Sequence, residues 1–357
     1  NNVGIGWRAL YANTTGTQNT AIGTDSLKAN TTGTGNTASG YRSLFTNTSA
    51  SFNTAMGQVA LALNTTGASN TAFGYKSLEA NTTGGQNVAV GDNALGANTT
   101  ADYNTAVGTS ALLRNTTGTQ NVSIGAFTLD TNTTGGGNVA LGYQALRVNT
   151  TASNNTGVGH KALTANTTGG DNTALGRDAL GANTTASNNT ALGRMSLLSN
   201  TTGAGNTGVG LSALRNNTTA ANNTAVGMQA LNINTTGASN VAVGNDALYA
   251  NTTASNNTAV GKSALAANTT GHSNTAFGQG AGDSITTGTG NTLIGLGADT
   301  TAVDSANTVV LGVNVQGATN YTTLGNGSND IRAAHGNVTW ATVSDQRYKK
   351  DIVDSTA

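Results

Sequence analysis

Apolar residues return along this chain at a fixed interval. Each unit begins with an Asn, numbered here as position 1. Thr or Val follows at position 2, a small residue at position 3, a larger aliphatic at position 4 and Gly at position 5, as in Asn87–Gly91. A Leu occupies position 9, and Asn-Thr-Thr or a close variant occupies positions 12–14. The alternation at the start of the unit is typical of a short strand, and the Gly- and Thr-rich remainder is typical of turns.

The interval is 17 residues and does not vary across the array. Asn recurs at every seventeenth position from Asn2 to Asn291, without insertion or deletion. A disordered linker has no physical reason to keep such a register, whereas one extra residue in a stack of coils would misalign every ladder above it. Seventeen residues are also too few for a helical-hairpin repeat, which takes about 33–45. We therefore predict an all-β fold, a parallel β-solenoid or β-roll of about 17–18 coils with one coil per repeat.

Stacked coils place the same side chain of each repeat above its copy. An Asn amide can both donate to and accept from such a neighbour, and a Leu can fill the interior. This interpretation explains the Asn-Thr-Thr motifs better than N-glycosylation, although each is formally a glycosylation sequon. The predicted ladders include Asn2, Asn19, Asn36 and Asn53 at position 1, Asn13, Asn30 and Asn64 at position 12, and Leu10, Leu27 and Leu44 at position 9.

The strand has one very small face, from positions 3 and 5, and one face of medium-sized side chains, from positions 2 and 4. Position 4 carries, for example, Val90, Val107, Ile124 and Leu141. We expect something to pack against both faces, with about two well-buried aliphatics per repeat. Because that burial is small beside the entropy cost of ordering a coil, we expect further copies of the chain to contribute. A homotrimer whose coils share a central axis fits best, and a single-chain solenoid is the alternative.

Composition excludes several classes of function. Only 8% of residues are charged, 15 basic side chains balance 15 acidic ones, and no basic face is available to bind nucleic acid. The chain has no Cys and only three His, so we expect no disulfide, metal or other cofactor. No apolar run is long enough to span a bilayer. Without recurring paired carboxylates, the array is not expected to be an enzyme. The chain begins in mid-pattern without Met, and we interpret it as a segment of a longer protein.

The pattern changes towards the C-terminus. Leu is lost at 280–282, and the Asn307–Gly312 motif arrives one residue earlier than the 17-residue interval predicts. We divide the chain into a repeat shaft (2–290), a β transition or cap region (291–343) that protects the open end of the array, and a distinct terminal segment (344–357).

The terminal segment carries the sharpest motif, Ser-Asp-Gln-Arg-Tyr-Lys-Lys-Asp-Ile over 344–352, with Trp340 just before it. It resembles the start of the intramolecular chaperone, or self-cleaving peptidase S74, domain at the C-terminus of phage tail fibres and tailspikes. The resemblance implies a trimeric fibre and autoproteolysis just before Ser344. It also implies that Ser344 is the nucleophile, that Lys349 is its base and that Asp345 supports them.

The strand motif is loosely similar to the Asn-Ser-Val-Ala-Ile-Gly motif in the head repeats of trimeric autotransporter adhesins. Our leading hypothesis is an extracellular homotrimeric phage tail fibre for host attachment, with a surface receptor that includes a glycan as one possibility. Bacterial surface adhesin is the nearest alternative. Ice binding through the regular Thr pairs, such as Thr14-Thr15, is the alternative from another class. The outward aromatic side chains that could stack on sugars are Trp7, Tyr41, Tyr75 and Tyr143.

Overall fold

The computed structural model describes residues 1–328, 330–336 and 341–342, and within them it contains strands and turns but no helix. The fold is an all-β parallel solenoid of about 19 coils with a 17-residue period. The predicted all-β parallel solenoid with a 17-residue period is therefore confirmed, with about 19 coils where about 17–18 were expected. The period extends slightly further along the chain than the sequence suggested. The coils form two compact units, residues 1–205 and the described residues from 206 onward.

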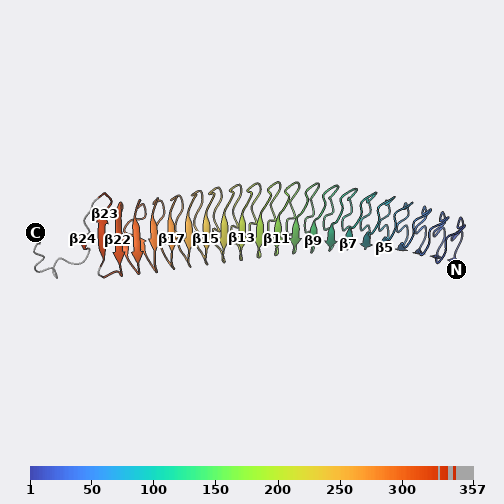
Figure 1. Cartoon of the computed structure of the whole chain (residues 1–357), viewed down its shortest axis with the longest axis horizontal. Coiled ribbons are helices and arrows are strands. Elements are labelled where there is room, and N and C mark those ends of the chain that lie inside the picture. Colours follow the sequence, from blue (N-terminus) through green and yellow to red (C-terminus); the bar gives the residue numbers. More distant parts are fainter. Residues whose placement is uncertain (329, 337–340, 343–357) are drawn as a thin grey trace, which may run out of the picture. The chain divides into compact units, whose positions relative to one another are not determined.

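In residues 1–205, each coil contributes one three-residue strand to a parallel sheet. Neighbouring strands pair at a constant offset, as Val88 with Thr105 and Val90 with Val107. Figure 1 shows β5, β7, β9 and β11 following one another along this unit. The strands are β1 (Val3–Ile5), β2 (Thr20–Ile22), β3 (Thr37–Ser39), β4 (Thr54–Met56), β5 (Thr71–Phe73), β6 (Val88–Val90), β7 (Thr105–Val107), β8 (Val122–Ile124), β9 (Val139–Leu141), β10 (Thr156–Val158), β11 (Thr173–Leu175) and β12 (Thr190–Leu192).

From residue 206 the same arrangement holds, and the sheet then changes character near its end. The parallel strands are β13 (Thr207–Val209), β14 (Thr224–Val226), β15 (Val241–Val243), β16 (Thr258–Val260), β17 (Thr275–Phe277), β18 (Thr292–Ile294), β20 (Val309–Gly312) and β22 (Tyr321–Gly325). The antiparallel strands β23 (Ile331–Ala334) and β24 (Ala341–Thr342) follow β22. A separate parallel pair joins β19 (Asp299–Thr300) to β21 (Gln316–Gly317).

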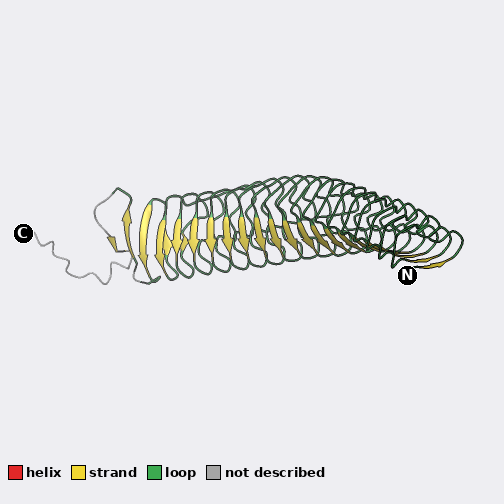
Figure 2. Cartoon of the chain, turned by 45° about the vertical axis from the view of Figure 1, so that its right-hand side comes forward, coloured by secondary structure: helices red, strands yellow, loops and turns green. Residues whose placement is uncertain are grey.

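Each coil turns back on itself because several residues adopt positive φ. Positions 7 and 9 do so in the repeats, as at Asn93 (φ 56°) and Leu95 (φ 51°). The Gly at position 5 has a different requirement, since Gly91 has φ 133° and a Cβ there would lie 2.6 Å from the carbonyl oxygen of Gly108 in the next coil. Figure 2 shows the result, with strands on one side of the coils and loops elsewhere. Position 5 must therefore be Gly for both backbone and packing reasons.

The interior is narrow and is filled by one Leu and small residues from each coil. Leu27, Leu44 and the equivalent Leu residues up to Leu265 are fully buried. Position 3 faces this Leu, because a Cβ on Gly157 would lie 3.3 Å from Cγ of Leu146. Burying one Leu contributes about 1.5–3 kcal/mol, which exceeds the cost of about 1–2 kcal/mol for its left-handed backbone.

The expected second buried aliphatic is absent. Position 4 points away from the interior, and Leu141 and Phe73 are 43% and 52% exposed. The prediction of two well-buried aliphatics per coil was wrong for the single chain, because Ala at position 3 and Leu at position 9 already fill the narrow interior.

Two Asn ladders run through each unit and meet at one carbonyl in each coil. At position 1, the backbone N–H of Asn36 donates to Oδ1 of Asn19 in the preceding coil (3.0 Å). At position 12, Nδ2 of Asn30 donates to Oδ1 of Asn13 (2.8 Å). Nδ2 of Asn19 and Nδ2 of Asn30 also both donate to the carbonyl of Gly33, at 2.8 and 3.0 Å. The amides thus tie each coil to the next and close each coil across its own loop.

In one coil the interior Leu is missing, and side chains from two other positions fill the space that it leaves. Gly282 stands at position 9, and a Cβ there would lie 2.9 Å from Leu265. Leu293 replaces the usual Ala at position 3, Ile285 replaces the Asn at position 12, and both are fully buried. The second Asn ladder consequently ends at Asn268, whose buried Oδ1 has no hydrogen-bond partner.

The 17-residue register continues past this point. Val309 pairs with Thr292 and Leu311 with Ile294, and the backbone N–H of Thr308 donates to Oδ1 of Asn291 (3.0 Å). The expected early start at Asn307 was therefore wrong: Thr308 takes the ladder position, and Asn307 belongs to the preceding turn. The register shortens only at the next coil, where Val309 pairs with Thr322.

Candidate interaction surface

The outward side of the strands is the most uniform surface of the array. We call the side chains at positions 2 and 4 of β1–β18 the strand face. Position 2 is Thr or Val in every strand, position 4 is apolar in every strand except β3, where it is Ser39, and no strand residue is charged. Phe73, Leu141, Leu175 and Phe277 are 52%, 43%, 50% and 51% exposed. Within each compact unit, such a row of partly exposed apolar side chains is typical of an interaction site, unlike a lone exposed Leu.

Charged side chains gather on a different part of the coil. We call positions 6, 7, 10 and 11, which follow the strand, the variable turn. Every charged residue between 1 and 290 falls there except Asp102 and Asp171. These positions also vary most between coils, so the variable turn differs from coil to coil while the strand face stays chemically constant.

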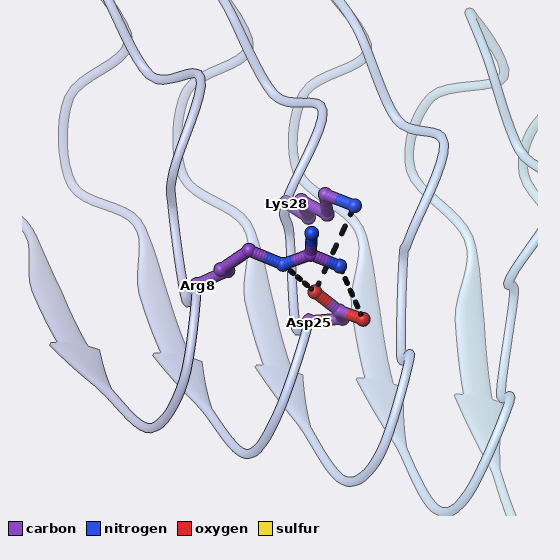
Figure 3. A network of polar contacts seen from close by, with 3 residues as sticks. All are labelled: Arg8, Asp25 and Lys28. Carbon is purple, nitrogen blue, oxygen red and sulfur yellow. Dashed lines mark hydrogen bonds and ion pairs between the residues drawn. The ribbon is translucent and has the colours of Figure 1, made fainter.

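The first coils hold a small ion network on the variable turn (Figure 3). Nε and Nη2 of Arg8 donate to the two carboxylate oxygens of Asp25, at 2.7 and 3.2 Å. Nζ of Lys28 lies 3.8 Å from the same carboxylate. The hydrogen bond from Arg8 lowers the pKa of Asp25 below its usual value, partial burial opposes this, and the charges of Arg8, Lys28 and Arg42 add to the lowering. The network holds neighbouring coils together.

Aromatic side chains are scattered over the variable turn. Trp7, Tyr41, Tyr75 and Tyr143 are 71%, 48%, 45% and 45% exposed. In one place the ring of Tyr143 stacks on the ring of His160 (5.6 Å between centroids) and contacts the ring of Phe127 edge-to-face (6.2 Å between centroids).

An open hollow of about 340 Å³ occurs further along the variable turn. It is lined by Gln229, Asp246, Tyr249, Ser263 and Ala266. The hollow combines one aromatic ring with carboxylate, amide and hydroxyl groups.

The Thr pairs after the ladder Asn do not form a flat strand surface. Positions 12–16 lie in bends without strand pairing. The first Thr of each pair uses its hydroxyl within the fold, as Oγ1 of Thr65 donates to the carbonyl of Thr82 (3.0 Å). The ladder Asn of the sequons, such as Asn64, is fully buried with both amide hydrogens bonded.

Comparisons with family models, curated proteins and solved structures find no match for this chain.

The sequence-predicted functional residues fall into two groups. Ser344, Asp345 and Lys349 lie outside the described residues. The ladder residues Asn19, Asn30 and Leu27 lie inside the coils, where they hold the fold. The sequence analysis expected the larger side chains at position 4 to be well buried, but in the single chain they lie on the outward strand face. The signal was the period-2 alternation of the strand, in which the smaller side chains at position 3 are the inner ones.

Among the described residues, no three or more His, Asp or Glu side chains gather in a way that could hold a metal ion. Within the same residues, no helix is available to cross a membrane. The fold is consistent with a structural role.

Proposed function

We propose that this chain is a shaft segment of an extracellular homotrimeric fibre, a phage tail fibre that serves host attachment. The observation that carries the proposal is the strand face, an uncharged and partly exposed surface with a row of apolar side chains at position 4, repeated at a fixed interval along the coils. A monomer would leave this surface in water, and association of copies removes it from water at a gain of about 25 cal/mol per Å².

The terminal motif supports the tail-fibre assignment. The resemblance of residues 344–352 to the start of a self-cleaving chaperone domain points to a fibre that trimerises before autoproteolysis. In this proposal the hydroxyl of Ser344 attacks the carbonyl carbon of the preceding peptide bond while neutral Lys349 takes its proton, and Asp345 supports the pair. The C–N bond then breaks as Lys349 returns the proton to the leaving amine, and water hydrolyses the resulting ester to give a free carboxylate and a new N-terminus at Ser344. A bacterial surface adhesin of the trimeric autotransporter type fits the same strand face, and its support is the similarity of the strand motif.

The variable turn is the part of the surface on which receptor recognition is proposed. Its residues differ from coil to coil, whereas those of the strand face do not. The hollow around Tyr249 and Asp246 offers a ring for stacking and polar groups for hydrogen bonds, which suits a glycan receptor.

The solution mass tests this proposal directly. Light scattering should give about three times 35.2 kDa, with a band that resists SDS until the sample is boiled. A mass of one chain at micromolar concentration would overturn the trimeric fibre and leave a single-chain solenoid. Ice binding would then be examined by a thermal-hysteresis measurement.

A further inference from the structure

We propose that copies of this chain assemble parallel and in register through the strand face, with position 4 of each coil meeting position 4 of the same coil in its partners. This inference rests on the proposed assembly of several copies and adds which surface joins them and in what alignment.

The chemistry of the surface favours another copy over a different partner. The strand face carries no charge in β1–β18, so a charged partner such as a nucleic acid or an acidic polysaccharide finds no complement on it. Its side chains recur at one coil spacing, about 4.8 Å. A second copy of this chain has the same spacing throughout and can match it over many coils.

Closed rotational symmetry about an axis parallel to the stack favours the in-register alignment. Position 4 changes in size along the array, from Ser39 in β3 to Met56 in β4 and Phe73 in β5. Around an axis parallel to the stack, each of these residues meets only its own copies, so bulky side chains lie at one level and the small Ser lies at another. A two-fold antiparallel pairing would instead oppose unrelated coils.

The available area is sufficient for a stable interface. If each position-4 side chain exposes about 70 Å², strands β1–β18 present about 1,260 Å² per copy. Shared between two neighbours in a trimer, this gives about 1,260 Å² of total buried surface for each pair of chains, at the low end of a standard interface. The Thr and Val side chains at position 2 add to this area. The variable turn has no comparable continuous apolar surface, because charged residues interrupt it.

The absence of Cys from the chain gives a clean test. In Val107→Cys the single thiol stands at position 4, and in the matched control Thr109→Cys it stands at position 6 of the same coil. Each variant is treated with a short bis-maleimide, which tolerates a wider separation than a disulfide, and is then run on a denaturing gel. Because one bis-maleimide links two of the three thiols in a trimer of Val107→Cys, about two thirds of the chains are expected as covalent dimers. Thr109→Cys should stay uncross-linked.

Alignment is tested by mixing chains. Tagged Val107→Cys and untagged Val158→Cys chains are denatured together and refolded, and the in-register arrangement predicts no mixed covalent dimer. A second variant, Leu141→Lys, should dissociate the assembly in light scattering while its far-UV spectrum stays that of the solenoid. Its control Tyr143→Lys, on the variable turn, should keep the assembled mass.

The outcomes separate this inference from the proposed function. Single-chain mass for the unmodified protein would overturn both. An assembled mass with unreacted Val107→Cys and cross-linked Thr109→Cys would overturn the strand-face interface alone. Mixed dimers between Val107→Cys and Val158→Cys would overturn the in-register alignment.

Discussion

The second Asn ladder allows a stability prediction from counted hydrogen bonds. Asn115 is fully buried, and its Nδ2 donates to Oδ1 of Asn98 (3.1 Å) and to the carbonyl of Gly118 (2.8 Å). Its Oδ1 accepts a hydrogen bond from Nδ2 of Asn132 (2.8 Å). Asn115→Ala removes all three bonds. The carbonyl of Gly118 still accepts from Asn104 (2.9 Å), so it keeps a partner.

Two groups are left without partners by Asn115→Ala, namely Oδ1 of Asn98 and one amide hydrogen of Asn132. A buried unsatisfied group costs about 1–3 kcal/mol, so the free energy of unfolding should fall by about 2–6 kcal/mol per chain. Asn115→Asp should also be strongly destabilising at neutral pH, because it places a carboxylate against two oxygen acceptors. Loss of one partner around a buried charge costs about 3–5 kcal/mol.

The Asp variant also has a pH signature. Its folded-state pKa should be raised above the unfolded value of about 3.9, since only the neutral acid can donate a hydrogen bond in the ladder. Its deficit relative to the unmodified chain should therefore shrink as pH falls from neutral towards the unfolded pKa.

Denaturant unfolding monitored by circular dichroism at several pH values provides the measurement. The control is Asn222→Asp, which changes an exposed residue at position 17, where another coil already carries Asp171. Reasoning from the ladder is refuted if Asn115→Ala is as stable as the unmodified chain, or if Asn222→Asp loses as much as Asn115→Asp.

Three further predictions follow from other features of the coils. Gly91→Ala should lower the unfolding midpoint because its Cβ would meet the carbonyl of Gly108 at 2.6 Å; Gly170→Ser, at a position where other coils carry Ser, should leave the midpoint nearly unchanged. Arg8→Gln should move the pKa of Asp25 back up towards its usual value in an NMR titration, and a titration unchanged by the substitution would contradict the network in Figure 3. In the unmodified chain this pairing stabilises the fold above the unfolded pKa of Asp25, and that stabilisation is lost as pH falls through the lowered folded pKa. The chain should show no thermal hysteresis, because the first Thr hydroxyls of the Asn-Thr-Thr motifs are bonded within the fold, as at Thr65; measurable hysteresis would refute this.

The sequence was sufficient to predict the architecture because every level of the pattern repeats. A fixed spacing from Asn19 to Asn36 and onward allows only a structure in which equivalent residues lie above one another. Identifying the inner face of the strand was harder. Hydrophobicity alone suggests that Leu141 is buried and Ala140 is peripheral, whereas the narrow interior accepts only the smaller side chain. Which side of the strand faces inward depends on the space left beside Leu146 and its copies, and the sequence of one strand does not reveal that space.

The C-terminal part shows a second limit of reading residues one position at a time. The missing Leu at Gly282 looked like the end of the pattern, yet Leu293 and Ile285 refill its space from other positions. Thr308 likewise keeps the position-1 ladder without an Asn side chain, because its backbone N–H donates to Oδ1 of Asn291 just as the backbone N–H of each ladder Asn does. Compensation between positions can preserve a register after its signature residues have changed.

The shared carbonyl at position 15 has a consequence for how this chain can change over generations. Because the carbonyl of Gly33 receives amides from both Asn19 and Asn30, a coil is a closed module with identical upper and lower contacts. Insertion or loss of a few residues within a coil breaks this closure, but a recombination event that copies or removes 51 nucleotides, three for each of 17 residues, adds or deletes a module and leaves every junction intact. Natural variants of the array should therefore differ by whole coils of 17 residues, and an engineered array can be lengthened or shortened by whole coils in the same way.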